Sequence, residues 1–216
     1  FIPKMHAAAA SKIDARLEVV DANGLLPMRA ATKVYSRAFD FRRFLQKALP
    51  PHLEHMPLED PIKGLAPVDA TVKAGILSHV SAWPLATDDV LAGETLDSMP
   101  LDHSVGRVDF EGGFVAGEQR MHDFLDGAYP RYGEDRNHPD DGSSSGLSPW
   151  LHFGHVSTHQ VFHEIAANEG WSIDRLAAKV NGARHGWWGM SENAEAFLDE
   201  LITWREVGFN MCALNP

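Results

Sequence analysis

Apolar side chains recur at helical spacing in several stretches of the chain, and this recurrence predicts most of its secondary structure. The longest run covers residues 191–212, where apolar positions fall one turn apart after Ser191, a residue type that often caps helices. Further helices are predicted over residues 31–49, 114–130, 149–168 and 173–180, with shorter ones near 70–80 and 86–93. The pattern therefore predicts a mainly α protein, and it contains no internal repeat.

One stretch near the start has the pattern of a strand instead. Residues 16–21 read RLEVVD, with Val19 and Val20 at the centre. The Asn23-Gly24 pair that follows is typical of a turn. We therefore expect a short strand and a turn ahead of the first long helix.

Residues 50–112 lack a regular apolar pattern and are rich in proline, which occurs at positions 50, 51, 57, 61, 67, 84 and 100. Proline ends or interrupts helices. We interpret this stretch as a linker between domains that carries short helices. The chain then divides into residues 1–49, 50–112 and 113–216.

Composition narrows the class of protein. Apolar residues make up 44% of the 216 positions, which is enough for a packed core. Cys212 is the only cysteine, so no internal disulfide forms, and this suits a cytoplasmic protein. No apolar run approaches the roughly 20 residues that span a bilayer. Because the chain starts at Phe1 and stops just after its clearest helix, we expect it to be a piece of a longer protein.

The net charge of −11 speaks against nucleic-acid binding, because proteins that bind nucleic acids usually carry a basic patch. A net charge does not report how charges are distributed over the surface. The net charge therefore remains an argument against nucleic-acid binding for the candidate sites described below.

A serine-rich loop leads into a predicted helix at residues 143–149. Ser143, Ser144 and Ser145 offer hydroxyl donors, and Gly146 allows close approach of the backbone. Ser148 can cap the helix that follows, and free N–H groups at a helix start attract anions. The stretch fits a diphosphate site, and it equally fits an ordinary polar loop before a well-capped helix.

Four histidines follow within one predicted helical region. His155, His159 and His163 are spaced four residues apart, which can place metal ligands on one helix face, and His152 precedes them. The HExxH pattern is absent, and no carboxylate is spaced to complete a site. The alternative is a set of packing and solvated histidines.

Aromatic residues accompany an acid in the helix near residues 197–206. Glu200 and Trp204 lie four residues apart, and Phe197 lies about one turn earlier. A partly apolar setting favours a neutral carboxyl, which can donate a hydrogen bond to a developing anion. The alternative is a surface acid beside a core tryptophan. For Trp187-Trp188 we expect packing in the core, and the alternative is that one of the two stacks on a ligand.

Together these stretches resemble the photolyase/cryptochrome family, and within it DNA photolyases of class II. The resemblance rests on Tyr132 followed by GEDRNHPDDGSSSGLS and PWLHFGHVS, with Trp150 where the family has tyrosine, and on FLDELITWREVGFNMC at 197–212. VVDANGLLPMR at 19–29 and FRRFLQKALPPHL at 41–53 are similar to the end of the family's N-terminal α/β domain. The resemblance implies that residues 1–49 are the tail of that Rossmann-like domain. It also implies that residues 113–216 are the first part of the helical FAD-binding domain.

The resemblance also implies roles for individual residues. The residues implied to contact FAD are Tyr132, Ser144, Ser145, Leu147, Ser148 and Phe197. Glu200 would hydrogen-bond the damaged base pair, and Trp204 would pack on it. Arg136 and Arg205 would contact DNA phosphates or balance charge in the active site. No residue is implied to bind a metal. In many relatives the position of Trp204 is basic, or the tryptophan lies one residue closer to the acid.

The implied activity is that of a lyase that splits cyclobutane pyrimidine dimers in damaged DNA. Light would drive one electron from reduced FAD to the dimer, the ring would open, and the electron would return. We expect a monomer that is not bound to a membrane, with an antenna chromophore in the N-terminal domain, and no activity of this piece alone. Open alternatives are repair of (6-4) products, a cryptochrome-like blue-light sensor without repair, and a histidine-rich metal-binding module.

Overall fold

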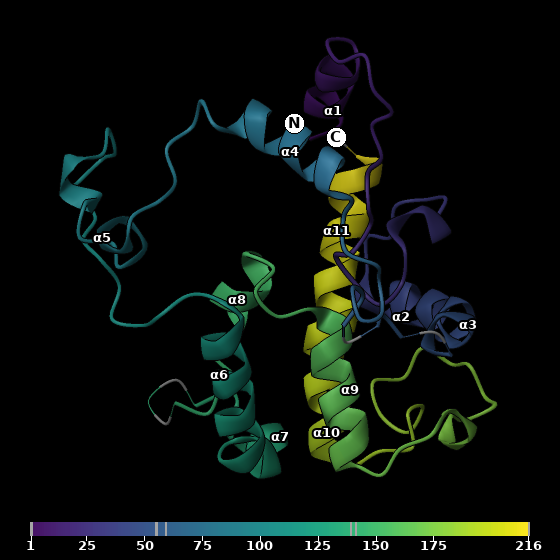
Figure 1. Ribbon diagram of the computed structural model, residues 1–216. Helices are drawn as coiled ribbons and strands as arrows, with labels where there is room; N and C mark the ends of the chain where they lie inside the picture. The colour runs from purple at the N-terminus through teal and green to yellow at the C-terminus, as the bar shows by residue number, and fades with distance from the viewer. Residues whose placement is uncertain (1, 55, 59, 139, 141, 216) are drawn as a thin grey trace. The chain divides into compact units, whose positions relative to one another are not determined.

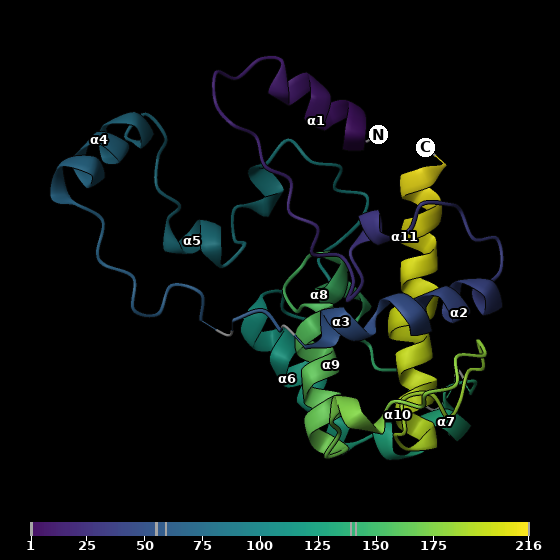
Figure 2. The same ribbon diagram turned by 90° about the vertical axis from the view of Figure 1, so that its right-hand side faces the viewer.

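The computed structural model of the protein describes residues 2–54, 56–58, 60–138, 140 and 142–215. Residues 139 and 141 of the predicted loop therefore lie outside the described residues. Within the described ranges all regular secondary structure is helical (Figures 1 and 2), which confirms the predicted mainly α fold. The helices are α1 (Ile2–Ala10), η1 (Met28–Ala30), α2 (Ala38–Ala48), α3 (Pro50–Leu53), α4 (Ala70–Val80), α5 (Asp88–Leu91), η2 (Leu96–Ser98), α6 (Phe114–Asp126), η3 (Tyr129–Arg131), α7 (Tyr132–Asp135), α8 (Ser148–His152), α9 (Thr158–Asn168), η5 (Ile173–Arg175), α10 (Glu192–Leu198), η6 (Asp199–Trp204) and α11 (Arg205–Leu214).

The chain forms two compact units. One comprises residues 1–57 and 112–216, and the other comprises residues 58–111. The second unit holds α4, α5 and η2, and none of its described side chains is buried. This agrees with its proline-rich, unpatterned sequence. The assignment of residues 1–49 to the tail of an α/β domain stays a prediction.

A long helical rod organises the first unit. α10, η6 and α11 follow one another along one line (Figures 1 and 2), where the sequence predicted a single helix over 191–212. Ser191 caps the rod as predicted, since its Oγ accepts a hydrogen bond from the Ala194 N–H at 3.2 Å. η6 is a π-helix, a rare form that often marks functional sites. α2 packs against the rod at this π-helical segment.

Several helices end earlier or later than predicted. The helix predicted over residues 114–130 ends at Asp126, and the helix predicted over 149–168 is divided into α8 and α9 near Gly154, whose φ is 70°. The helix predicted over residues 31–49 begins only at Ala38. The helix predicted over residues 173–180 is wrong beyond the single turn of η5, because the Ala177 N–H bonds instead to the Trp187 carbonyl at 2.9 Å.

The predicted strand at residues 16–21 does not form. Residues 16–22 have no regular structure, and the side chains of Val19 and Val20 are 62% and 83% exposed. A strand needs a partner for its backbone hydrogen bonds, and the described part of the chain contains no other strand that could supply them.

Aromatic residues fill much of the core of the first unit. The Phe124 ring lies 4.9 Å from Phe197 and 5.7 Å from Tyr132, centroid to centroid. Trp187 and Trp188 are both buried, with 4% and 7% of their surfaces exposed. Both tryptophans therefore belong to the core, as expected, and the alternative in which one of them stacks on a ligand is not supported.

Candidate functional site

A cavity of about 1290 Å³ lies within the first unit. Its walls come from the segment after residue 20, from α7, from the serine-rich loop with α8, and from the rod. The lining residues are Asn23, Tyr132, Arg136, Asn137, Ser144, Ser145, Gly146, Ser148, Pro149, Leu151, His152, Phe153, Phe197, Glu200, Leu201, Arg205 and Phe209. Segments far apart in the sequence thus meet around one space.

Most of the predicted site residues lie on this cavity. The structure brings together eight of them, namely Tyr132, Arg136, Ser144, Ser145, Ser148, Phe197, Glu200 and Arg205. Leu147 and Trp204 are not among the lining residues. Eight of the ten predicted site residues thus lie around one cavity, and their roles stay predictions.

Leu147 belongs to the core. Its side chain is fully buried at 0% exposure, between lining residues on either side of it in the chain. An apolar side chain held in this way anchors the loop. Its predicted contact with a cofactor is not supported by the position of its side chain.

Trp204 lies outside the cavity lining and is 47% exposed. The prediction placed Trp204 beside Glu200 because positions four apart share a face of an α-helix. η6 is instead a π-helix, in which hydrogen bonds join positions five apart. Arg205, five residues after Glu200, lines the cavity with it. The predicted packing of Trp204 on a substrate stays a prediction.

The serine-rich loop is held in place by Arg120 from α6. The guanidinium Nε donates to the Ser145 carbonyl at 2.8 Å, and Nη2 donates to the Ser144 carbonyl at 3.3 Å. Gly146 has a φ of 65°, and a Cβ there would lie 2.8 Å from the Arg120 Nε. Only glycine fits this conformation and this approach without strain. Arg120 and Gly146 therefore fix the conformation of the loop.

Ser148 starts α8 instead of capping it. The N-cap position is Leu147, which makes no side-chain hydrogen bond, and Pro149 follows Ser148 inside the helix. α8 has five residues, so its dipole is small. The polar character of this wall comes mainly from the hydroxyl groups of Ser144, Ser145 and Ser148.

Two aromatic rings form another wall. Tyr132 and Phe197 meet edge to face at 5.2 Å. Burial is the main cause of the raised pKa of Tyr132, and the nearby Glu200 carboxylate raises this pKa further. Tyr132 therefore stays neutral at ordinary pH and offers its hydroxyl together with an apolar ring.

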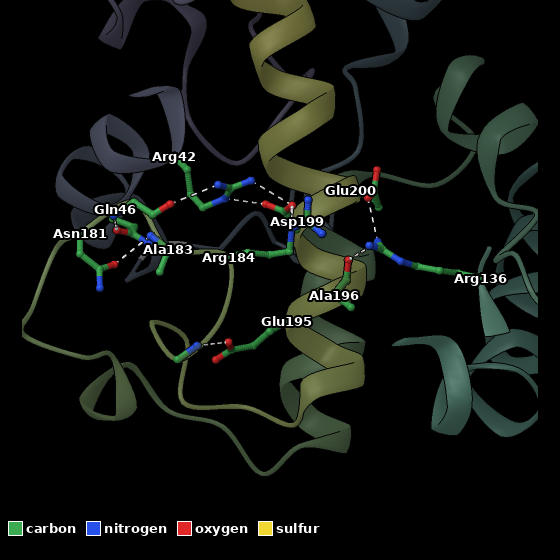
Figure 3. Close-up of polar contacts among 12 residues, drawn as sticks. Arg42, Gln46, Arg136, Asn181, Ala183, Arg184, Glu195, Ala196, Asp199 and Glu200 are labelled. Atoms are coloured by element: carbon green, nitrogen blue, oxygen red, sulfur yellow. Dashed lines mark hydrogen bonds and ion pairs between the residues drawn. The ribbon is translucent and has the colours of Figure 1, made fainter. Parts of the chain in front are cut away.

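Glu200 forms an ion pair with Arg136 across the cavity wall. Arg136 Nη1 donates to Glu200 Oε1 at 2.8 Å and to the Ala196 carbonyl at 3.3 Å (Figure 3). The Glu200 side chain is 43% exposed. The ion pair places the carboxyl group of Glu200 beside a cation, and not in the apolar setting that the sequence suggested.

Asp199, the neighbour of Glu200, points to the opposite side of the rod (Figure 3). Its side chain is 2% exposed and accepts two hydrogen bonds from Arg42 of α2, at 2.7 and 3.0 Å. The Arg184 Nε lies 3.1 Å from Asp199 Oδ2, the oxygen that also accepts from Arg42 Nη2. This buried cluster holds the π-helical segment on the side of the rod opposite Glu200. It therefore fixes the orientation of the rod in which Glu200 faces the cavity.

Two arginines give the cavity positive charge. The Nε atoms of Arg136 and Arg205 are buried, and neither has a hydrogen-bond partner among the described residues. Burial lowers the pKa of Arg205, which remains charged, and its guanidinium lies 4.9 Å from the Phe209 ring centroid. An unpaired buried donor is unfavourable. The two groups therefore fit an anionic ligand.

The histidines do not converge. His152 lines the cavity, whereas His155 Nδ1 accepts a hydrogen bond from the Gly113 N–H at 3.0 Å. Burial lowers the pKa of His159. The described residues contain no group of three or more His, Cys, Asp or Glu side chains that could hold a metal ion.

Sequence reasoning missed several residues that shape the site. Asn23 lines the cavity, Arg120 holds the serine-rich loop, and Asp199 anchors the π-helix. Glu206 is buried beside Arg205 and binds the Asn23–Leu26 turn. A charged residue within an apolar helical run, such as Asp199, was the available signal, because such a residue is rarely buried without a partner.

Among the described residues, no helix has the length and apolar character needed to cross a membrane. No protein-family model matches the chain. The chain is 27% identical over 139 residues to a deoxyribodipyrimidine photo-lyase of Potorous tridactylus, covering 64% of this chain and 22% of that protein. It is 29% identical over 201 residues to a deoxyribodipyrimidine photo-lyase of Arabidopsis thaliana, covering 91% and 35%.

A third relative is Cryptochrome-1 of Arabidopsis thaliana, 31% identical over 117 residues, which cover 51% of this chain and 16% of that protein. The chain thus spans at most about a third of the length of these relatives. These matches and the helical fold agree with the resemblance of the chain to photolyases and cryptochromes.

Proposed function

We propose that the chain is the central part of a light-dependent DNA repair flavoprotein that splits cyclobutane pyrimidine dimers, and that it resembles class II photolyases most. One observation carries the proposal. The serine-rich loop, Tyr132, Phe197 and Glu200, which are separate in the sequence, line one cavity of about 1290 Å³. Two of the relatives above are named deoxyribodipyrimidine photo-lyases, which supports the same activity.

The residues on the cavity fit FAD. The hydroxyl groups of Ser144, Ser145 and Ser148 would hydrogen-bond a diphosphate, and the rings of Tyr132 and Phe197 would contact the flavin. The unpartnered buried guanidinium nitrogens of the two arginines suit a ligand with several anionic groups. When bound and reduced, FAD would supply the light-driven electron that opens the cyclobutane ring.

Arg136 would control the charge of Glu200. In the ion pair Glu200 is an acceptor only, because a carboxylate carries no proton to donate. A DNA phosphate that binds Arg136 would compete with the carboxylate for the guanidinium. The neutral form of Glu200 would donate a hydrogen bond to the carbonyl oxygen of the dimer, where negative charge develops. Arg205 would balance charge on the same wall.

A cryptochrome-like sensor without repair is the second candidate. The net charge of −11 and the match to Cryptochrome-1 favour this candidate, because a sensor without repair does not require a DNA-binding surface. The two candidates share the flavin and differ in their action on DNA.

The test uses the full-length protein, reduced and illuminated with blue light, with an oligonucleotide that contains one cyclobutane dimer. We expect a flavin absorption spectrum and loss of the dimer in the light but not in the dark. Bound flavin without loss of the dimer would favour the sensor. A parallel oligonucleotide with a (6-4) product decides the type of lesion.

A further inference from the structure

The Asn23-Gly24 turn forms part of the cavity wall, although its sequence suggests only a turn. Asn23 is exposed on the lining. Its backbone carbonyl accepts a hydrogen bond from Thr158 Oγ1 of α9 at 3.3 Å. Within the described residues, no hydrogen bond joins its side-chain amide to the protein. The turn thus presents a free amide to the cavity from a fixed backbone.

Glu206 of α11 holds this turn from the other side. Its Oε1 accepts hydrogen bonds from the N–H groups of Leu25 at 2.7 Å and Leu26 at 3.4 Å. The Glu206 side chain is buried, with 5% of the residue exposed, and its Oε2 has no hydrogen-bond partner among the described residues. The turn is therefore attached to α11 by one buried carboxyl group.

Gly24 makes this attachment possible. A Cβ at this position would lie 2.5 Å from Glu206 Oε1, so the backbone and the carboxyl approach closely only because residue 24 is glycine. Two charged groups act on Glu206, namely Arg205, which attracts it, and Asp21, which repels it. Burial raises the pKa of Glu206 to about 7, which supports a largely neutral carboxyl below that pH.

The rod therefore carries adjacent residues with different tasks. Arg205 faces the cavity, while Glu206 faces the turn that carries Asn23 to the same cavity. An amide N–H₂ group donates two hydrogen bonds. On a cavity that two arginines also line, this group suits oxygen atoms of an anionic ligand.

We propose that Asn23 is a ligand-contacting residue that donates a hydrogen bond to an oxygen of the bound flavin nucleotide, and that Glu206 is the positioning residue that holds it there. This inference rests on the proposed function for the identity of the ligand. Neither residue is among those that the family resemblance implies to contact FAD.

The first experiment measures the affinity of the full-length protein for FAD by flavin fluorescence. Asn23→Ala removes one hydrogen bond of about 0.5–1.5 kcal/mol, so affinity falls about two- to tenfold. Asn23→Asp replaces the donor with a negative charge and lowers affinity at least as much. Asn168→Ala, at an exposed asparagine of α9 outside the cavity, leaves affinity unchanged.

The second experiment tests Glu206 through Asn23. We expect Glu206→Ala to lower FAD affinity. Glu206→Gln should keep the wild-type affinity, because its amide oxygen still accepts from the turn. Asn23→Ala should add little further loss when it is combined with Glu206→Ala. Thermal unfolding identifies variants that do not fold. Wild-type affinity in Asn23→Ala, or fully additive losses in the double variant, would overturn the inference. A wild-type protein that binds no FAD would refute the proposed function, and the inference with it.

Discussion

Glu206 makes the stability of the folded chain depend on pH in a direction opposite to that of most carboxyl groups. Burial raises its pKa from an ordinary value of 4.5 to about 7, against the opposing effect of the two N–H groups that it accepts from. The folded protein therefore holds a proton between these pH values that the unfolded chain releases. The stabilisation is fully present below about pH 4.5 and is lost as pH rises through about 7.

The magnitude follows from the shift. One pKa unit corresponds to about 1.4 kcal/mol, so the shift corresponds to about 3 kcal/mol in total, of which about 2–3 kcal/mol is lost between about pH 5 and about pH 8. Glu206→Gln cannot ionise and keeps an oxygen that accepts from the Leu25 N–H. The variant should therefore lack this part of the pH dependence.

The assay is urea unfolding of both proteins at about pH 5 and about pH 8, followed by circular dichroism. The histidines and other carboxyl groups titrate in both proteins, so their contribution cancels in the comparison. We expect the free energy of unfolding of the wild type to fall more than that of Glu206→Gln by about 2–3 kcal/mol. Equal falls would mean that Glu206 is ionised in the folded protein, and the reasoning would be refuted.

Three further predictions concern the residues around the cavity. Asp199→Ala leaves Arg42 buried without its partner, so urea unfolding should show a loss of about 3–5 kcal/mol, and a loss below about 1 kcal/mol would contradict a structural ion pair. Gly146→Ala forces a left-handed conformation and a collision with Arg120, so stability should fall by about 1–3 kcal/mol and FAD affinity with it, whereas wild-type affinity would show that the loop adapts. Glu200→Gln should keep FAD binding and lower the yield of dimer repair per absorbed photon, and an unchanged yield would remove Glu200 from the mechanism.

Local signals in the sequence were sufficient for much of the fold. Ser191 caps the rod as predicted, because a cap depends on neighbours within a few residues, whereas the helix predicted over 114–130 ends earlier, at Asp126. The strand at residues 16–21 failed because a strand depends on a partner elsewhere, and the described residues contain none.

The site was predictable where chemistry and position lie in one stretch, as in the serine-rich loop. It was not predictable where one partner is a backbone group far away. Glu206 looks like a surface acid next to Arg205 until the fold brings the Leu25 N–H to it. The π-helix had no visible signal either, and it decides that Arg205 and not Trp204 lines the cavity with Glu200.

The central claim is that this cavity belongs to an enzyme that repairs DNA with light and a flavin. Its most direct test is the number of cyclobutane dimers lost from an irradiated oligonucleotide, per bound FAD, when the reduced full-length protein receives blue light. The account predicts loss of dimers in the light and none in the dark. Protein that binds FAD but leaves the dimers intact under illumination would contradict it.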